Sequence, residues 1–88
     1  MVKKLRKDSQ AMKDLLVAIA QGLVDDPSAV NVTVDEANEE GIIVYHLNVA
    51  DSDKGRVIGK QGRIAKAIRT VMRSAATRNN EKISVEID

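Results

Sequence analysis

Two glycines, Gly59 and Gly62, enclose the part of this 88-residue chain whose residue types are best suited to chemistry. Glycine at each end of a short loop removes the Cβ atoms that would hold a phosphate away from the backbone. Backbone N–H groups there, and at the start of a following helix, offer donors and positive dipole to phosphate oxygens. Lys60 and Gln61 lie between the glycines and are predicted to be exposed. Three further cations flank the loop, namely Arg56, Arg63 and Lys66. The spacing predicts a phosphate-binding loop.

The charge of the chain is segregated along its length. Residues 54–78 carry eight Lys/Arg and no Asp/Glu, whereas residues 1–53 carry five Lys/Arg and ten Asp/Glu. A solvated helix face would explain an ordinary basic stretch, but this segregation favours a polyanionic partner. Tyr45 is the only aromatic residue, which argues against modules that stack bases on exposed Phe or Tyr. Binding of a nucleic acid would therefore depend on the loop, on charge and on an apolar groove.

Other chemistries fit the residues poorly. The absence of Cys excludes disulfides, thiolate metal sites and Cys nucleophiles. No acid or nucleophile stands at a useful spacing from His46, the only histidine. A nucleotide-binding P-loop needs GxxxxGK[ST] after a strand, and here Gln61 stands where Ser or Thr would hold magnesium. We interpret the acid pairs Asp25-Asp26, Glu39-Glu40 and Asp51/Asp53 as solvated turn residues. The sequence predicts no enzyme, no cofactor and no metal site.

The elements that must position the loop follow from hydrophobic periodicity. The expected helices span residues 11–24, 54–58 and 62–78, and the expected strands span residues 30–34, 42–49 and 83–87. Asp51-Ser52-Asp53 is expected to be a turn or a helix cap. The short polar turn at residues 36–41 favours an antiparallel hairpin of the first two strands. Because three strands alone cannot bury their apolar faces, helices must cover one side of the sheet.

The stretch from Val57 to Ile64 resembles the V-I-G-x-x-G core of KH domains, and the α-β-β-α-α-β order matches their type II form. More narrowly, residues 10–87 resemble the small stand-alone bacterial KH proteins of the KhpA (YlqC) family. The stretches that carry this resemblance are Tyr45-His46-Leu47-Asn48, Asp53 to Arg63, and Ala67-Ile68-Arg69-Thr70. The resemblance implies an α+β fold, a single type II KH domain at residues 9–88 with a three-stranded sheet covered on one face by helices. Residues 1–8 form a basic tip, for which we favour disorder over an electrostatic tether.

The resemblance also implies a function. In KH domains the loop clamps the backbone of about four nucleotides of single-stranded RNA, and the bases lie in an apolar groove beside it. By carry-over, the floor of that groove would include Val57, Ile58 and Ile64. The predicted RNA-binding residues are Arg56, Val57, Ile58, Gly59, Lys60, Gln61, Gly62, Arg63, Ile64 and Lys66. Single-stranded DNA stays an alternative because no residue visibly reads a 2′-OH, and so does a protein-interaction module with little RNA binding.

Partners are expected from the resemblance and from the long helix. KhpA-type proteins are cytoplasmic, pair with a KhpB-type (Jag/EloR) KH protein, are regarded as RNA chaperones and are linked to cell-wall homeostasis and cell elongation. The apolar residues of the helix at 62–78 span an arc of roughly 180°, wider than a helix on a sheet needs. We therefore predict an interface there, with a homodimer and a heterodimer both open. Its candidate residues are Ile68, Val71, Met72 and Ala75. No apolar run approaches the length of a membrane span.

Overall fold

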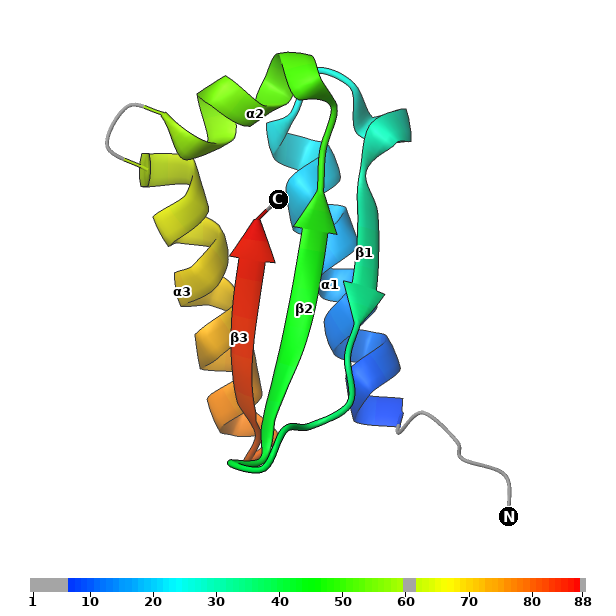
Figure 1. The fold of residues 1–88 in the computed structure, drawn as a ribbon, viewed down its shortest axis with the longest axis vertical. Coiled ribbons are helices and arrows are strands. Elements are labelled where there is room, and N and C mark those ends of the chain that lie inside the picture. The colour runs from blue at the N-terminus through cyan, green and yellow to red at the C-terminus, as the bar shows by residue number, and fades with distance from the viewer. Residues whose placement is uncertain (1–6, 60–61, 88) are drawn as a thin grey trace.

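The computed structural model describes residues 7–59 and 62–87 (Figure 1). Predictions that concern residues 1–6, Lys60, Gln61 and Asp88 lie outside the described residues. Along the described chain the elements are α1 (Lys7–Leu23), the 3-10 turn η1 (Pro27–Ala29), β1 (Asn31–Val34), β2 (Ile42–Asn48), α2 (Asp51–Ile58), α3 (Arg63–Arg78) and β3 (Lys82–Ile87). The predicted order α-β-β-α-α-β is confirmed, with η1 added after α1.

The three strands form one sheet in the order β1-β2-β3. β1 and β2 are antiparallel, as the short connection between them predicts, and β2 and β3 are parallel. Parallel neighbours need a crossover connection, which α2 and α3 supply here. Figure 1 shows α1 and α3 on one face of the sheet, with β1 and β3 as its two edges. The α+β architecture with helices covering one face is confirmed.

The core lies between the sheet and the two long helices. Tyr45 and Leu47 on β2 are fully buried, and Tyr45 is the register partner of Val34 on one side and Val85 on the other. The helices contribute Met12, Leu16 and Ala20 from α1, and Ile68, Met72 and Ala76 from α3. Each fully buried large aliphatic side chain stabilises the fold by about 1.5–3 kcal/mol. The only aromatic ring is therefore a core residue and offers no stacking surface.

Two helices begin earlier than the periodicity predicts. α1 begins at Lys7 instead of Ala11. α2 begins at Asp51, and its N-cap residue is Ala50, which makes no side-chain capping bond. The expectation that Asp51-Ser52-Asp53 forms a turn or cap is therefore wrong. Acidic residues are also favoured in the first turn of a helix, where they lie near its positive end. Residue types alone therefore do not distinguish a turn or cap from a first helical turn.

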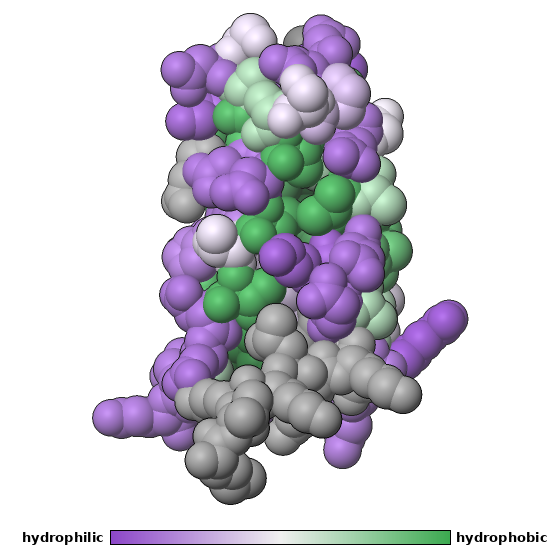
Figure 2. All heavy atoms as spheres, turned by 90° about the vertical axis from the view of Figure 1, so that its right-hand side faces the viewer, coloured by the Kyte–Doolittle hydropathy of each residue, from purple (hydrophilic) through white to green (hydrophobic). Residues whose placement is uncertain are grey.

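The side of the molecule that carries α1 and β1 shows a band of apolar atoms between polar flanks (Figure 2). β1 is an edge strand there, and half-buried valines pack against the core from both elements, among them Val17 and Val34.

Within the described part of the chain, no helix has both the length and the apolarity to span a bilayer.

Candidate nucleic-acid interface

The loop between α2 and α3 is a tight backbone turn. Gly59 N–H donates to the Gly55 carbonyl at 2.7 Å, and Gly62 N–H donates to the Gly59 carbonyl at 2.9 Å. A Cβ on Gly59 would collide with the Gly55 carbonyl oxygen. Gly62 has φ 67°, the left-handed region that side chains disfavour. Each glycine therefore has a backbone requirement in addition to the open approach that the sequence suggested.

The turn leaves the N-terminus of α3 without a cap. Gly62 is the N-cap residue and has no side chain to bond the first N–H groups of the helix, and no acidic residue lies in the first turn. These N–H groups and the helix dipole make such a terminus a site for anions. Arg63 and Lys66 are both exposed within this first part of α3. The turn thus combines donors and positive charge in one place, next to Lys60 and Gln61.

Arg56 occupies a different position from the one the sequence suggested. Its Nη1 lies 2.7 Å from Asp25 Oδ1, beyond the end of α1. This hydrogen bond and the charge of Asp25 raise the pKa of Arg56. Residues two apart lie on nearly opposite faces of a helix, so Arg56 and Ile58 do not share a face of α2. In this structure Arg56 joins α2 to the end of α1 and does not lie beside Ile58.

The predicted apolar floor is divided between core and surface. Val57 is only 1% exposed and belongs to the core, so its side chain is not available to a ligand on the described surface. Ile58 is 51% exposed and is the largest apolar side chain that α2 presents to solvent. Ile64 is half-buried. Of the three residues, Ile58 and Ile64 keep accessible surface, while Val57 anchors the end of α2 in the core next to the loop.

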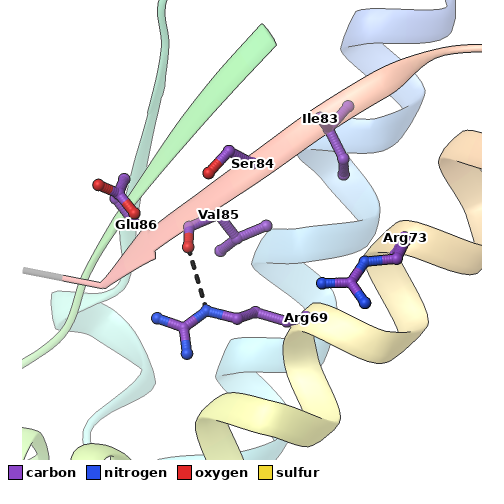
Figure 3. Close-up of a pocket in the computed structure, with 6 residues that line it drawn as sticks. All are labelled: Arg69, Arg73, Ile83, Ser84, Val85 and Glu86. Carbon is purple, nitrogen blue, oxygen red and sulfur yellow. Dashed lines mark hydrogen bonds between the residues drawn. The ribbon is translucent and has the colours of Figure 1, made fainter. Parts of the chain in front are cut away.

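A shallow pocket of about 180 Å³ lies between α3 and the edge strand β3 (Figure 3). The side chains of Arg69 and Arg73 extend from α3 toward the strand, and Arg69 Nε donates to the Val85 carbonyl at 3.2 Å. The remaining lining residues are Ile83, Ser84 and Glu86. The predicted site stopped at Lys66 and missed this pocket. Lys66, Arg69 and Arg73 recur at helical spacing, which could have extended the site along α3.

The α3 residues predicted for a partner interface do not share one face. Ile68 is 1% exposed and Met72 is fully buried, so both face the core and their assignment to an interface is wrong. Val71 is 46% exposed and Ala75 is half-buried, so these two alone stay available to a partner. The wide apolar arc of α3 is explained in large part by small core residues, since Ala65 and Ala76 are also buried.

The acidic and histidine residues also depart from expectation. Asp35 Oδ2 lies 2.8 Å from His46 Nε2, so the expectation that no acid stands near His46 is wrong. The antiparallel pairing of β1 and β2 brings the end of β1 to His46. Asp53 is 1% exposed and is not a solvated turn residue. Among the described residues, no group of three or more His, Asp or Glu side chains could hold a metal ion.

Comparison with known proteins finds a matching family model and relatives that share one name. The family model described as KhpA/KhpB, KH domain matches residues 13–87. A protein of Clostridium acetobutylicum named RNA-binding protein KhpA is 54% identical over 76 residues, which cover 86% of this chain and 99% of the relative. Proteins of the same name are 49% identical in Chlamydia caviae and 46% identical in Listeria monocytogenes, each over 86% of this chain and over 95% and 97% of the relative.

The fold is also found within larger solved proteins. It matches a variant of Aquifex aeolicus Era bound to GDP and AlF4− with a TM-score of 0.65 and 18% identity. It matches Era in complex with MgGDPNP and nucleotides 1506–1542 of 16S ribosomal RNA with the same score and identity. Both matches cover 99% of this chain and 32% of the Era chain. The chain spans about a third of Era, and at this identity the likeness concerns the fold alone.

Proposed function

The chain belongs to the KhpA/KhpB KH-domain family, and from this premise we propose that it binds single-stranded RNA and catalyses no reaction. The observation that carries the proposal is the turn from Gly59 to Gly62, which opens α3 with an uncapped N-terminus beside exposed cations. The name of the KhpA relatives supports RNA as the ligand. We place the phosphates at this turn.

Charge supports this placement. Arg63 and Lys66 are exposed, and neither forms an ion pair with a described residue. Lys60 and Gln61 stand between the glycines and are part of the proposed clamp. Phosphates held here would meet the first N–H groups of α3 and these cations together, so the contact would not depend on base identity.

The groove that receives the bases is proposed to run from Ile58 along α3 to β3. Ile58 supplies exposed apolar surface at one end, and the pocket between α3 and β3 supplies polar groups further along. As an edge strand, β3 has one side not paired to another described strand, and Val85 already accepts a bond from Arg69 there. Bases can reach such a groove only when they are not paired in a duplex, which favours single strands.

The proposed partners and cellular role are drawn from the family. We include cytoplasmic location, pairing with a KhpB-type protein, an RNA-chaperone role and a link to cell-wall homeostasis and cell elongation. The exposed Val71 and the neighbouring Ala75 support a surface for self-association or for that partner. Light scattering at tens of micromolar distinguishes the two versions, because a strict monomer would leave only pairing with a different protein.

The experiment that tests RNA binding reverses the charge of the loop. The double variant Lys60→Asp/Gln61→Asp places two carboxylates against phosphates. At about 4 Å and an effective dielectric constant near 20, each repulsion reaches about 4 kcal/mol before salt screens it. We expect affinity for a short single-stranded RNA, measured by fluorescence anisotropy, to fall tenfold or more.

The chain offers a control with the same residue types and the same charge change. Lys13→Asp/Gln10→Asp places both carboxylates in the first half of α1, at the opposite end of that helix from Asp25. The RNA affinity of this control variant should stay close to that of the wild-type protein, after allowance for the variant's lower net charge. Equal losses in the two double variants would show only a general charge effect. An unchanged affinity in the loop variant would contradict the proposed site and favour an interaction module without RNA binding.

A further inference from the structure

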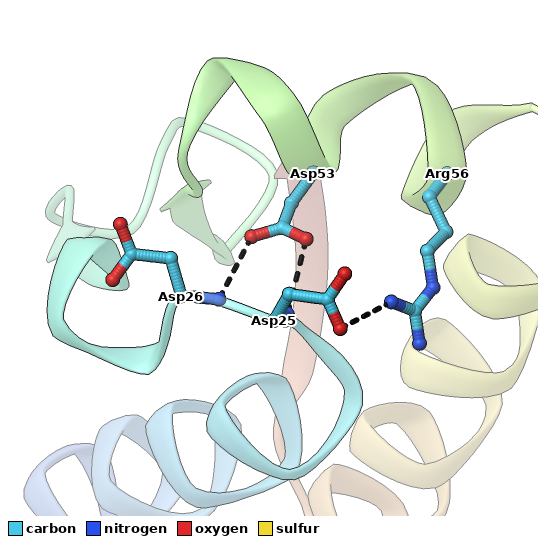
Figure 4. Close-up of polar contacts among 4 residues, drawn as sticks. All are labelled: Asp25, Asp26, Asp53 and Arg56. Carbon is cyan, nitrogen blue, oxygen red and sulfur yellow. Dashed lines mark hydrogen bonds and ion pairs between the residues drawn. The ribbon is translucent and has the colours of Figure 1, made fainter.

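A buried carboxylate lies at the far end of α2 from the loop (Figure 4). The two oxygens of Asp53 accept hydrogen bonds from the backbone N–H groups of Asp25 and Asp26, at 3.0 and 3.1 Å. No described cation forms an ion pair with Asp53. Burying a carboxylate is costly unless its oxygens are bonded, so these two bonds and the first turn of α2 must hold its charge.

Arg56 makes a second connection to the same place. It is one turn further along α2, and its guanidinium lies 2.7 Å from the Asp25 carboxylate (Figure 4). Both groups of this ion pair are well exposed, so the pair alone contributes little to stability. Together, Asp53 and Arg56 attach α2 to Asp25 and Asp26, the second and third residues after the end of α1. We call these four residues, Asp25, Asp26, Asp53 and Arg56, the α2 clasp.

The clasp matters because α2 has little other anchorage. The helix is eight residues long, and its buried residues are Asp53 and Val57. Val57 is held by the core, near the loop, whereas Asp53 holds the opposite end. Because the core holds Val57, loss of the clasp would let α2 tilt about Val57, and the last residues of the helix and Gly59 would turn with it. Binding sites must hold their ligand contacts within about 10–20° of the productive orientation, so a larger tilt of α2 would weaken binding.

We infer that Asp53 is a positioning residue for the phosphate-binding turn, acting on RNA affinity through the orientation of α2 without touching the RNA. The inference rests on the proposed function of the turn from Gly59 to Gly62. Asp53 fits this role because its partners are backbone groups, which fix a direction as well as a distance. Arg56 contributes to the same attachment through its ion pair with Asp25, from the face of α2 that is turned away from Ile58.

The test compares two removals of charge from the same helix. Asp53→Asn loses one acceptor and brings an amide N–H against a backbone N–H. Asp51→Asn removes the same charge from the first turn, where the Asp51 side chain is 96% exposed and, among the described residues, pairs only with Lys54. Loss of a negative charge alone would strengthen binding to a polyanion in both variants. Positioning predicts opposite signs, with at least fivefold weaker RNA binding for Asp53→Asn and equal or slightly tighter binding for Asp51→Asn.

The measurements are RNA affinity at a temperature where each variant is fully folded, and the amide NMR signals of Gly59 and Gly62 in the free protein. Asp53→Asn should shift both signals, whereas Asp51→Asn should not. Equal affinity of the two folded variants would overturn the inference and leave Asp53 as a stability residue. If Asp53→Asn does not fold, Asp53→Glu decides, because it keeps the charge and displaces the carboxylate; wild-type affinity in that variant would likewise overturn the inference.

Failure of the proposed function is a separate outcome. If the wild-type protein binds no RNA, the turn is not an RNA site, whatever Asp53 does. The NMR signals of Gly59 and Gly62 still test positioning in that case, and signals that do not respond to Asp53→Asn would overturn it.

Discussion

Two turns of this molecule place glycine at positive φ, and they differ in their backbone donors and in the charges nearby. Gly41, in the connection from β1 to β2, has φ 80°, and Gly62, in the loop before α3, has φ 67°. A Cβ built on either glycine meets no atom within 4 Å. Both positions therefore need glycine for the backbone conformation, and in neither is space the reason.

The turns differ in what happens to their backbone donors. In the hairpin, the Asn38 side-chain oxygen accepts bonds from Glu40 N–H at 2.9 Å and Ile42 N–H at 3.1 Å, and two glutamates stand in the turn. In the loop, Gly62 has no side chain to accept such bonds, and the first residue of α3 is Arg63. Positive φ alone therefore does not make an anion site. The loop differs from the hairpin in keeping donors available and in surrounding them with cations.

The largest expected effect that tests this contrast is that of salt. If about three to five cations near the loop contact phosphates, log affinity should fall against log salt with a slope of roughly −2 to −3.5, since each contact on a single strand contributes about 0.7. Between 50 and 200 mM salt the affinity would then fall by about 16- to 130-fold. Anisotropy titrations across this range measure the slope. A flat response would contradict a phosphate clamp at the cationic turn.

The next effect separates the two glycines directly. Valine at either position must adopt the left-handed conformation or distort the turn, at a cost of about 1–2 kcal/mol or more. Thermal unfolding should therefore show similar destabilisation for Gly41→Val and Gly62→Val. RNA affinity should fall at least about tenfold for Gly62→Val alone, because only that turn carries phosphates.

Gly41→Val serves as the control for backbone strain without loss of a site. Equal RNA affinity for the two valine variants, measured while both are folded, would show that the conformation at Gly62 is irrelevant to binding. The phosphate contacts would then have to be sought along α3.

Much of this contrast could be predicted from sequence because its signals are local. Alternation in β2 predicted that Tyr45 and Leu47 share a face, and both are buried. Periodicity and the paired glycines predicted a short helix, a loop and a long helix in this order, and the structure has α2 and α3 on either side of the loop. These features depend on neighbours within a few residues, so the order of residue types contains them.

The rest depends on contacts between distant segments. Asp53 looks like any acid before a helix, and its partners are backbone N–H groups 27 and 28 residues away, which carry no residue-type signal. The apolar arc of α3 did not reveal that Met72 faces the core while Val71 faces solvent. The pocket beside Arg73 depends on the parallel placement of β3 at the sheet edge, which the sequence pattern leaves open.

The smallest expected effect tests how far the cationic surface extends from the turn. Arg73 lines the pocket beside β3, three turns along α3, and Arg78 is a similarly exposed arginine in the last turn of the same helix. If RNA follows the groove, Arg73→Ala removes one phosphate contact, which lowers affinity about threefold to fourfold near 0.15 M salt and reduces the salt slope by about 0.7. Arg78→Ala loses the same charge outside the pocket and should change affinity by less than about twofold. Equal effects of the two variants would confine the interface to the turn and the start of α3, and the pocket would then have no part in binding.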